Sequence, residues 1–276
     1  MEVNSLDCDK PMTICIGVIC DNGKKAVVAA DRMITAEHLS IEFESEDAKI
    51  IQLTDKVVAM TAGDALIHTE VFGAAKAKID TSITLVSQVA EKVKEAFVEE
   101  RKKRFEEEAL KPRGLTLVEF YGGAHRTLDP NIIMRLDRQL EDSRLDLQIL
   151  IAGVDQNGAH LYHLVDPGTA QCFDSLGFAG IGSGYPHAMS VFIYNHFNPR
   201  MDLNKAVYLV YEAKRRSESA PGVGKEYIDI AIIGSKIRFL SATELDQLKK
   251  IYDAKIRLEK PPEIEEMIKS LRWEEG

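Results

Sequence analysis

The order of strand-like and helix-like segments most constrains the fold of this chain. Near the start, two segments rich in Val, Ile and Ala, Thr13–Cys20 and Ala26–Ala30, flank the turn sequence Asp21-Asn22-Gly23. A second pair, Lys49–Leu53 and Val57–Thr61, flanks a short turn. Tight turns join antiparallel strands, whereas parallel strands need long crossover connections. The chain is therefore expected to begin with two antiparallel hairpins.

A stretch with helical spacing separates these hairpins from the rest of the chain. From Asp64 to Leu110, apolar residues recur every three or four positions, which predicts a long helical region. Lys111-Pro112-Arg113-Gly114 ends it, because proline lacks an amide hydrogen and glycine favours turns. Residues 115–143 show little pattern beyond a short helix near Ile132–Leu140. Residues 35–48 are expected to be mostly loop or edge strand.

A second block of strands follows, then two helices and a last strand. Asp202 is a suitable N-cap for the second of these helices. The predicted strands are Leu145–Gly153, His160–Val165, Ala170–Phe173, Phe178–Ile181 and Tyr227–Ile233, and the predicted helices are Pro186–Phe197 and Asp202–Arg216. The tail from Thr243 to Trp273 is expected to form two helices divided by Pro261-Pro262. Separate blocks of hairpins and helices indicate an α+β fold.

Composition and charge narrow the function. The 276 residues include 35 basic and 44 acidic side chains, a net charge of -9. This argues against a nucleic-acid partner, because phosphate neutralisation needs a basic face. No run of about 18 apolar residues predicts a membrane span. The first twelve residues do not resemble a secretory signal, so the cytoplasm is the expected compartment.

The cysteines do not suggest a metal site. Cys8, Cys15, Cys20 and Cys172 form no pair or Cys/His cluster with zinc spacing, so we expect no metal and no cofactor. Cys15 and Cys20 lie in an apolar run, where a buried free thiol is the ordinary outcome.

Several short sequences occur together in an order shared with one known family. They are Thr13-Ile14-Cys15-Ile16-Gly17, Val27-Val28-Ala29-Ala30-Asp31-Arg32, Lys49-Ile50-Ile51, Met60-Thr61-Ala62-Gly63-Asp64-Ala65, Ile151-Ala152-Gly153-Val154-Asp155, Val165-Asp166-Pro167 and Gly182-Ser183-Gly184. Each is common by itself, but their joint order, with fitting hairpins between them, is informative. Over roughly residues 13–234 the chain resembles a proteasome β subunit, a member of the N-terminal-nucleophile (Ntn) hydrolases.

This resemblance implies an α+β fold in which two antiparallel sheets pack together between flanking helices, the four-layer αββα sandwich of Ntn hydrolases. It divides the chain into a leader or propeptide at 1–12, a proteasome-like hydrolase domain at 13–240 and a C-terminal helical extension at 241–276. Residues 1–12, 115–143 and 240–276 have no counterpart in the family pattern.

The resemblance makes Thr13 the candidate nucleophile. A threonine hydroxyl is a weak nucleophile at neutral pH and needs a base. The α-amino group of an N-terminal threonine supplies one, with an ordinary pKa of about 7.7–8.0. Thr13 takes this role only if the Met12–Thr13 bond is cut. Autolysis at this non-glycine bond would expose it, as would a translation start at Met12 followed by trimming; otherwise the chain keeps its leader and is inactive.

Four further residues match the family's catalytic positions: Asp31, Lys49, Gly63 and Ser183. Lys49 is expected beside the nucleophile, where a cation lowers the hydroxyl pKa. Asp31 is expected to pair with Lys49, because burying a lone carboxylate is costly. The backbone N–H of Gly63 is expected to face the developing oxyanion, and Ser183 to lie near the α-amino group.

Part of the family pattern is absent. The family places an acid shortly before a serine-glycine turn, but here Ser219 occupies the acid's place and Gly222 that of the serine. Glu218 lies one residue out of register. No histidine arrangement typical of catalysis is evident, and surface or helix-packing roles are expected for His38, His68, His125, His187 and His196.

The resemblance implies a threonine-type endopeptidase or amidohydrolase that attacks a peptide or protein substrate through an acyl-enzyme on Thr13. Three alternatives stay open: transfer of the acyl group to another amine, action on a small amide, and a non-catalytic ring or assembly subunit. The family stacks into rings through its helices, so a homo-oligomer is expected, with neither a nucleic acid nor a membrane as partner.

Overall fold

The first predicted hairpin lies within one of the two main sheets. The computed structural model describes residues 12–36, 41–123, 126–259 and 262–271. In the hairpin, Val18 pairs with Val27 and Gly17 with Val28. Asp21, Asn22 and Gly23 all have positive φ, as the tight turn requires. The strands of this sheet, in spatial order, are β10 (Phe178–Ile181), β1 (Cys15–Cys20), β2 (Lys25–Ala30), β11 (Asp229–Ile233) and β12 (Ile237–Phe239).

The second predicted hairpin begins the other main sheet. Its pairs are antiparallel throughout, and its strands, in spatial order, are β5 (Ile51–Thr54), β6 (Val57–Gly63), β7 (Leu147–Asp155), β8 (Gly158–Val165) and β9 (Thr169–Cys172). A separate two-stranded sheet joins β3 (Met33–Ala36) and β4 (Ile41–Glu44). The region expected to be mostly loop or edge strand therefore includes a short hairpin of its own.

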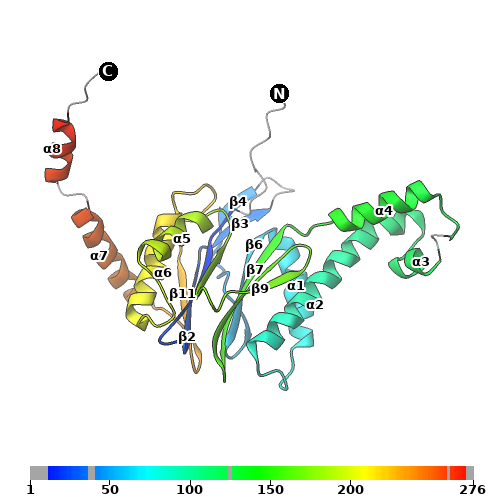
Figure 1. Ribbon diagram of the computed structural model, residues 1–276, viewed down its shortest axis with the longest axis horizontal. Helices are drawn as coiled ribbons and strands as arrows, with labels where there is room; N and C mark the ends of the chain where they lie inside the picture. The colour runs from blue at the N-terminus through cyan, green and yellow to red at the C-terminus, as the bar shows by residue number, and fades with distance from the viewer. Residues whose placement is uncertain (1–11, 37–40, 124–125, 260–261, 272–276) are drawn as a thin grey trace. The chain divides into compact units, whose positions relative to one another are not determined.

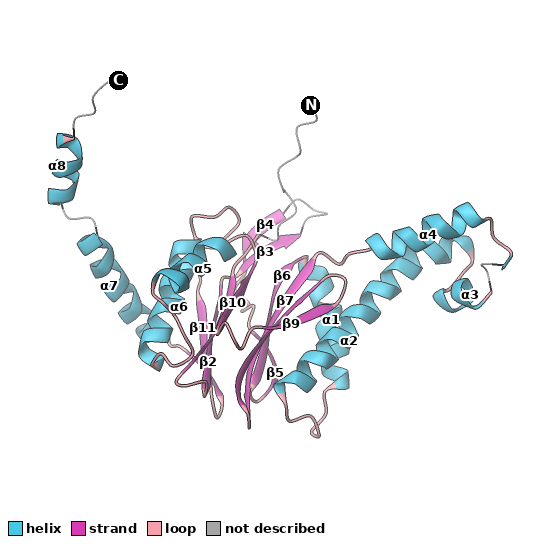
Figure 2. Ribbon diagram, viewed as in Figure 1, coloured by secondary structure: helices cyan, strands magenta, loops and turns pink. Residues whose placement is uncertain are grey.

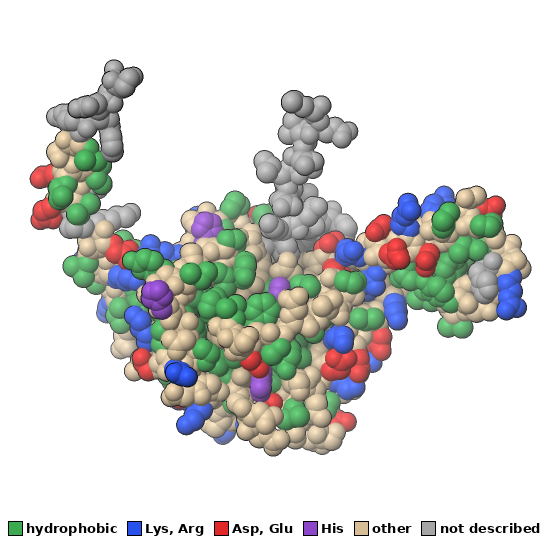
Figure 3. Space-filling model, in the orientation of Figure 1, with side chains coloured by type: hydrophobic (Ala, Val, Ile, Leu, Met, Phe, Trp, Pro, Cys, Tyr) green, Lys and Arg blue, Asp and Glu red, His purple; other side chains and the backbone are tan. Residues whose placement is uncertain are grey.

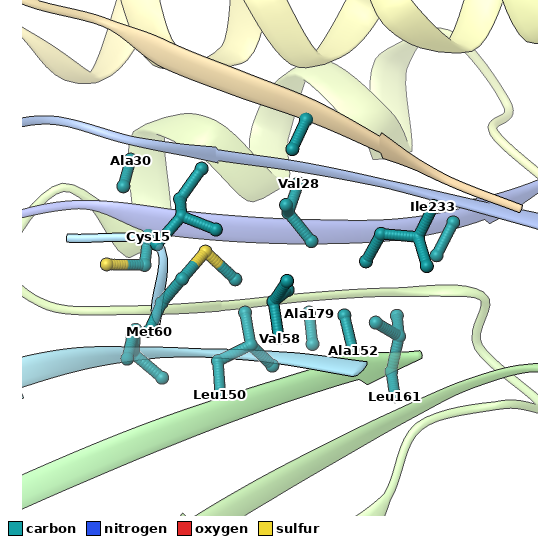
Figure 4. Close-up of a cluster of buried hydrophobic side chains, with 14 of the residues drawn as sticks. Cys15, Val28, Ala30, Val58, Met60, Leu150, Ala152, Leu161, Ala179 and Ile233 are labelled. Carbon is teal, nitrogen blue, oxygen red and sulfur yellow. The ribbon is translucent and has the colours of Figure 1, made fainter. Parts of the chain in front are cut away.

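The two main sheets share an apolar core. Successive side chains of a strand point to opposite faces, so every second residue of each sheet faces this core. Figure 4 shows side chains of one sheet meeting those of the other. The labelled residues are Cys15, Val28, Ala30, Val58, Met60, Leu150, Ala152, Leu161, Ala179 and Ile233. Burying each Val- or Leu-sized side chain contributes about 1.5–3 kcal/mol. This core fixes the positions of the two sheets relative to each other, and with them the strand ends that carry the candidate site.

Helices cover the outer faces of both sheets (Figure 2). α5 (Tyr185–Tyr194) and α6 (Leu203–Ser217) contact β10, β1 and β2. The side chain of Asp202 accepts a hydrogen bond from the Lys205 N–H, which confirms the predicted N-cap. On the other side, α1 (Ala65–Lys78) and α2 (Val86–Phe105) pack with β6 and β7 in a second apolar cluster.

The region predicted to be helical, from about Asp64 to Leu110, is helical apart from a break that divides it into α1 and α2. The chain leaves the helix after Lys78 and begins a new one at Val86. The Asp80 carboxylate accepts bonds from both the backbone N–H and the hydroxyl of Ser82. Such local bonding competes with helical hydrogen bonds and favours a turn. Apolar spacing alone did not reveal this break.

The end of α2 and the chain from there through α4 form an arm with a small core (Figure 1). One π-helical turn and one 3₁₀ turn follow α2, and the second ends at Gly114 with a φ of +71°. α3 (Leu117–Gly122) and α4 (Pro130–Asp142) then fold back. The helix expected near Ile132–Leu140 is confirmed, but α3 was not predicted. The core comprises Phe105, Ala109, Leu110, Phe120 and Leu136.

The arm's surface is amphipathic. Figure 3 shows apolar side chains gathered along one side of the arm and charged side chains of both signs elsewhere on it. Val118 and Met134 are among the exposed apolar residues.

Residues 239–276 form a second compact unit, described here by itself. It contains α7 (Ala242–Glu259) and α8 (Pro262–Ser270), the two helices predicted for the tail. The Ser241 hydroxyl accepts a bond from the Glu244 N–H, and the Glu244 carboxylate accepts one from the Ser241 N–H, a reciprocal cap. Within the described ranges, no helix has the length and apolar character needed to cross a bilayer.

Candidate active site

Three side chains from three separate segments meet at one end of the two sheets. Thr13 directly precedes β1 and Asp31 directly follows β2, so the first hairpin brings both to the same end. The backbone N–H of Asp31 donates to the carbonyl of Ile14 at 3.2 Å, which continues the strand pairing to this point. Lys49 precedes β5 and enters from the second sheet. Sheet packing therefore joins residues that are distant in sequence.

The three side chains form a closed hydrogen-bonded set. The Thr13 hydroxyl donates to Asp31 Oδ1, and Lys49 Nζ donates to Thr13 Oγ1. Lys49 Nζ also lies 3.0 Å from Asp31 Oδ1. Asp31 is 0% exposed, so these partners, and not water, stabilise its carboxylate. A carboxylate that accepts a hydrogen bond from the hydroxyl and a cation beside the same oxygen together polarise the Thr13 hydroxyl and stabilise negative charge on its oxygen.

A buried lysine, Lys214, holds the loop that binds the second oxygen of Asp31. The second oxygen of Asp31, Oδ2, accepts the Gly224 N–H at 2.9 Å. The carbonyl of Gly224 accepts Lys214 Nζ at 2.8 Å, and Lys214 also bonds Glu218 Oε1 at 2.6 Å. Lys214 is 0% exposed. The Lys214–Glu218 pair thus fixes the loop that holds the carboxylate of Asp31.

Gly63 lies in the wall of the same cavity as Thr13. It ends β6 with a φ of +131° and pairs with Leu147 of β7. A Cβ atom at this position would lie 2.2 Å from the Asp146 carbonyl oxygen. Only glycine fits this backbone, whatever further role its N–H has.

The cavity beside Thr13 has a volume of about 160 Å³. Its walls are mostly apolar, with Met33, Ile34 and Ile51 among them, and His68 contributes an imidazole. Burial lowers the pKa of His68, and the positive charge of Lys49 lowers it further. The imidazole is therefore neutral at neutral pH. The cavity can take an apolar side chain next to the Thr13 hydroxyl, and its lining also includes Asp47, Lys49 and Thr61.

His68 was not predicted as a site residue from the sequence, which favoured a surface or helix-packing role. Its position in the first turns of the helix after Gly63 was the available signal, because a helix that starts at the site points its early residues toward it. His38 and His125 lie outside the described residues.

Lys214 was missed as well. It follows Val207 and Val210 on α6 at three- and four-residue spacing, so it falls on the apolar face of that helix. A lysine in such a stripe signals a buried cation with a partner.

Among the described residues, Ser183 makes no side-chain hydrogen bond to Thr13. Its hydroxyl donates to the carbonyl of Pro221 at 2.8 Å. Its neighbours instead hold the Thr13 backbone: the Gly184 N–H donates to the Thr13 carbonyl at 3.2 Å. A Cβ atom at Gly182 would lie 2.3 Å from that carbonyl oxygen. The turn at 182–184 therefore positions the main chain of Thr13.

The residues at and beside the place of the family's acid, Ser219 and Glu218, bond to residues of α6. The Ser219 hydroxyl donates to the Arg216 carbonyl at 2.9 Å. Glu218 pairs with Lys214 and with Arg215, the latter at 2.9 Å. Glu218 is thus engaged in the support of the Gly224 loop.

Met12 is bonded to Thr13, so the Thr13 nitrogen is an amide and not a base. A Cβ atom at Gly222 would lie 2.1 Å from Met12 Cβ, so the Met12 side chain packs directly against the 219–224 loop. Thr13 itself is only 2% exposed. Removal of Met12 would free the amine of Thr13 and take away part of the cavity wall, because Met12 lines the same cavity.

Cys15 does not compete with Thr13 as a nucleophile. A thiolate is intrinsically more reactive than a hydroxyl. Burial raises the pKa of the Cys15 thiol to about 12, and Sγ donates to the Thr61 carbonyl at 3.4 Å. The predicted buried thiols at Cys15 and Cys20 are confirmed, Cys172 is exposed, and Cys8 lies outside the described residues.

Comparison with curated proteins gives two similar sequences. The chain is 37% identical over 103 residues to proteasome subunit beta 1 of Korarchaeum cryptofilum, a match that covers 37% of this chain and 48% of that protein. It is 29% identical over 110 residues to proteasome subunit beta 2 of Staphylothermus marinus, covering 39% of this chain and 50% of that protein. No family model matches the chain. The matches thus span about half the length of these relatives, and over that part the chain resembles proteasome β subunits.

Proposed function

We propose that this chain is a threonine-type Ntn hydrolase that cleaves an amide bond through an acyl-enzyme on Thr13. One observation carries the proposal: the Thr13 hydroxyl lies between Asp31 and Lys49 in a buried site. The resemblance to proteasome β subunits agrees with it. We further propose that the two sheets and their flanking helices form the four-layer αββα sandwich of Ntn hydrolases, with a leader at 1–12, a domain at 13–240 and a helical extension at 241–276.

In the proposed reaction, the Met12–Thr13 bond is cut first. The free α-amine of Thr13 accepts the hydroxyl proton while Oγ1 attacks the substrate carbonyl, and Lys49 stabilises the developing negative charge on Oγ1. The Gly63 N–H binds the oxyanion, a type of donor whose loss costs about 2.7–4 kcal/mol in comparable hydrolases. The ammonium then protonates the leaving amine. Water attacks the ester carbonyl, transfers a proton to the amine and releases the acid, which restores the Thr13 hydroxyl.

The test compares the full chain with a form that begins at Thr13. Intact mass and N-terminal sequencing establish which form carries a free Thr13 amine. We expect a threonine-reactive electrophile to label only that form, at Thr13, and Thr13→Ala to abolish both labelling and amide hydrolysis. Because Cys172 is exposed, the comparison is made in a Cys172→Ser background. Protein with a free Thr13 amine that is neither labelled nor active would refute the proposal.

A non-catalytic assembly subunit is the second candidate. One observation favours it: Glu218, next to the place of the family's acid, is engaged by Lys214 and Arg215. It predicts no turnover in any form, so a loss of measurable turnover on Thr13→Ala would eliminate it.

We also propose self-association in the cytoplasm, since the similar proteins are named as proteasome subunits. Light scattering after size-exclusion chromatography measures the mass of the assembly. A monomer at all concentrations tested would contradict this part of the proposal and leave the chemistry of Thr13 untouched.

A further inference from the structure

A second cavity is lined in part by the turn at Gly182, whose backbone also lies against the Thr13 carbonyl. It has a volume of about 270 Å³, larger than the cavity beside Thr13. Gln148 on β7 and His163 on β8 contribute polar groups, and Phe173 and Tyr185 contribute aromatic rings. Gly182 and Ser183 form part of its wall, so the backbone that touches Thr13 also lines this cavity.

Strand periodicity explains why polar groups face this space. Leu161 lies in the core between the sheets, and His163 is two residues further along β8, so it faces the same way. Leu150 lies in the same core, and Gln148 precedes it by two residues on β7. The inward row of each strand is apolar in the middle of the sheets and becomes polar where this cavity begins.

His163 has an unused hydrogen-bonding atom. Its Nε2 is buried and has no hydrogen-bond partner among the described residues. A buried polar atom without a partner is costly, so such atoms are usually explained by a water, an ion or a ligand. Burial lowers the pKa of His163, so the ring is neutral at neutral pH and offers one donor or one acceptor at Nε2 according to its tautomer.

The walls restrict the chemical class of a ligand. The His163 and Phe173 rings lie 5.9 Å apart at an angle of 60°. Together with Tyr185 they present aromatic surface, which favours planar groups. Of the described residues that line the cavity, none is an acid, a lysine or an arginine. A charged ligand would therefore lose its hydration without gaining an ion pair.

From this geometry we propose that the cavity is a binding site for an uncharged aromatic carboxamide, anchored at His163 Nε2. A carboxamide carries both a donor and an acceptor, so it pairs with either tautomer of the imidazole and also reaches Gln148. The aromatic ring packs against Phe173 and Tyr185. This inference does not rest on Thr13 being a nucleophile, because binding is measured on protein in which Met12 is still attached.

The probe is benzamide, titrated into the full chain and followed by NMR of ¹⁵N-labelled histidine rings. We expect a saturable shift of the His163 Nε2 signal. His163→Phe keeps an aromatic ring but removes the nitrogen, and it should weaken binding about tenfold, which corresponds to 1.4 kcal/mol. His68→Phe is the matched control, since His68 lines the cavity beside Thr13; it should leave benzamide binding unchanged.

Benzoate has the same shape as benzamide but carries a negative charge, and we expect it to give no saturable shift. Contacts between benzamide and the ring protons of Phe173 and Tyr185 in the unaltered protein place the ligand even if His163→Phe does not fold. The proposal is overturned if benzamide gives no saturable shift, if His163→Phe binds as tightly as the parent, or if His68→Phe weakens binding equally.

A last experiment distinguishes a free small molecule from a side chain of a peptide as the ligand of this cavity. N-acetylphenylalaninamide presents the same aromatic and amide groups within a capped amino acid. Displacement of benzamide by this compound would assign the cavity to a peptide segment. Binding of benzamide without such displacement would assign it to a free ligand of the same chemistry.

Discussion

Replacement of Gly63 by alanine tests the geometry at the end of β6. The new Cβ atom would lie 2.2 Å from the Asp146 carbonyl oxygen and 3.1 Å from Leu147 Cα. Both neighbours are backbone atoms of the paired strand, where Gly63 faces Leu147, so no side chain can move aside to relieve the overlap.

The magnitude follows from two costs. A close carbon–oxygen contact is about 3.3 Å, so the two strands must separate locally by roughly 1 Å. This weakens at least one ladder hydrogen bond, each worth about 0.5–1.5 kcal/mol. A φ of +131° adds strain for any side chain, on the order of 1–3 kcal/mol. We expect a loss of roughly 3 kcal/mol in the free energy of unfolding, or a fall in Tm of about 6–12 °C for a domain of this size.

Two other glycines provide matched controls. Gly23 has a φ of +78° but open space around a built Cβ, so Gly23→Ala should cost only about 1 kcal/mol. Gly73 lies inside α1, also with open space, and Gly73→Ala should stabilise the chain by up to about 1 kcal/mol because alanine favours the helix. Urea and thermal unfolding measure all three variants. If Gly63→Ala is no less stable than Gly23→Ala, the steric reasoning fails.

Three further outcomes follow from the site. Asp31→Asn should lower the rate of Thr13 labelling in the processed form about 100-fold, because a neutral amide no longer holds the Lys49 ammonium beside Thr13 Oγ1 by an ion pair; a rate within twofold of the parent would contradict this. Lys214→Met should lower that rate about tenfold and alter its pH profile, since the Gly224 loop behind Asp31 loses its anchor, whereas Arg216→Met on the same helix should change stability only. Stability should fall as the pH drops below about 6.5, because the unfolded chain then binds protons at His68 and His163 that the folded chain does not, their folded pKa values being lowered by burial. Replacing both histidines with phenylalanine should flatten this part of the stability–pH curve; an unchanged curve would show that other groups cause it.

Much of the architecture was readable from local chemistry. The Asp21-Asn22-Gly23 turn, the alternation within strands and the Asp202 cap each depend on residues within a few positions of one another. Hydrogen bonding and backbone preference act at that range, so the pattern predicts the element. The break between α1 and α2 was missed because apolar spacing continues across it, while Asp80 and Ser82 form a turn that spacing does not reveal.

The meeting of Asp31 and Lys49 was also expected, but for a different reason. A charged residue that directly follows an apolar strand must find a partner, because its burial is otherwise costly. That argument predicts a pair without locating it. The position of the pair at the Thr13 hydroxyl depends on how the two sheets pack.

The sequence by itself determined most strands and helices, several turns and the candidate set around Thr13. Only the tertiary structure decided what surrounds that set: Lys214 behind Asp31, His68 in the cavity wall, and Ser183 bonded to Pro221. These contacts join residues from different sheets and helices. Their geometry depends on the packing of whole elements, and local sequence preference carries no information about the distance between side chains that only such packing brings together.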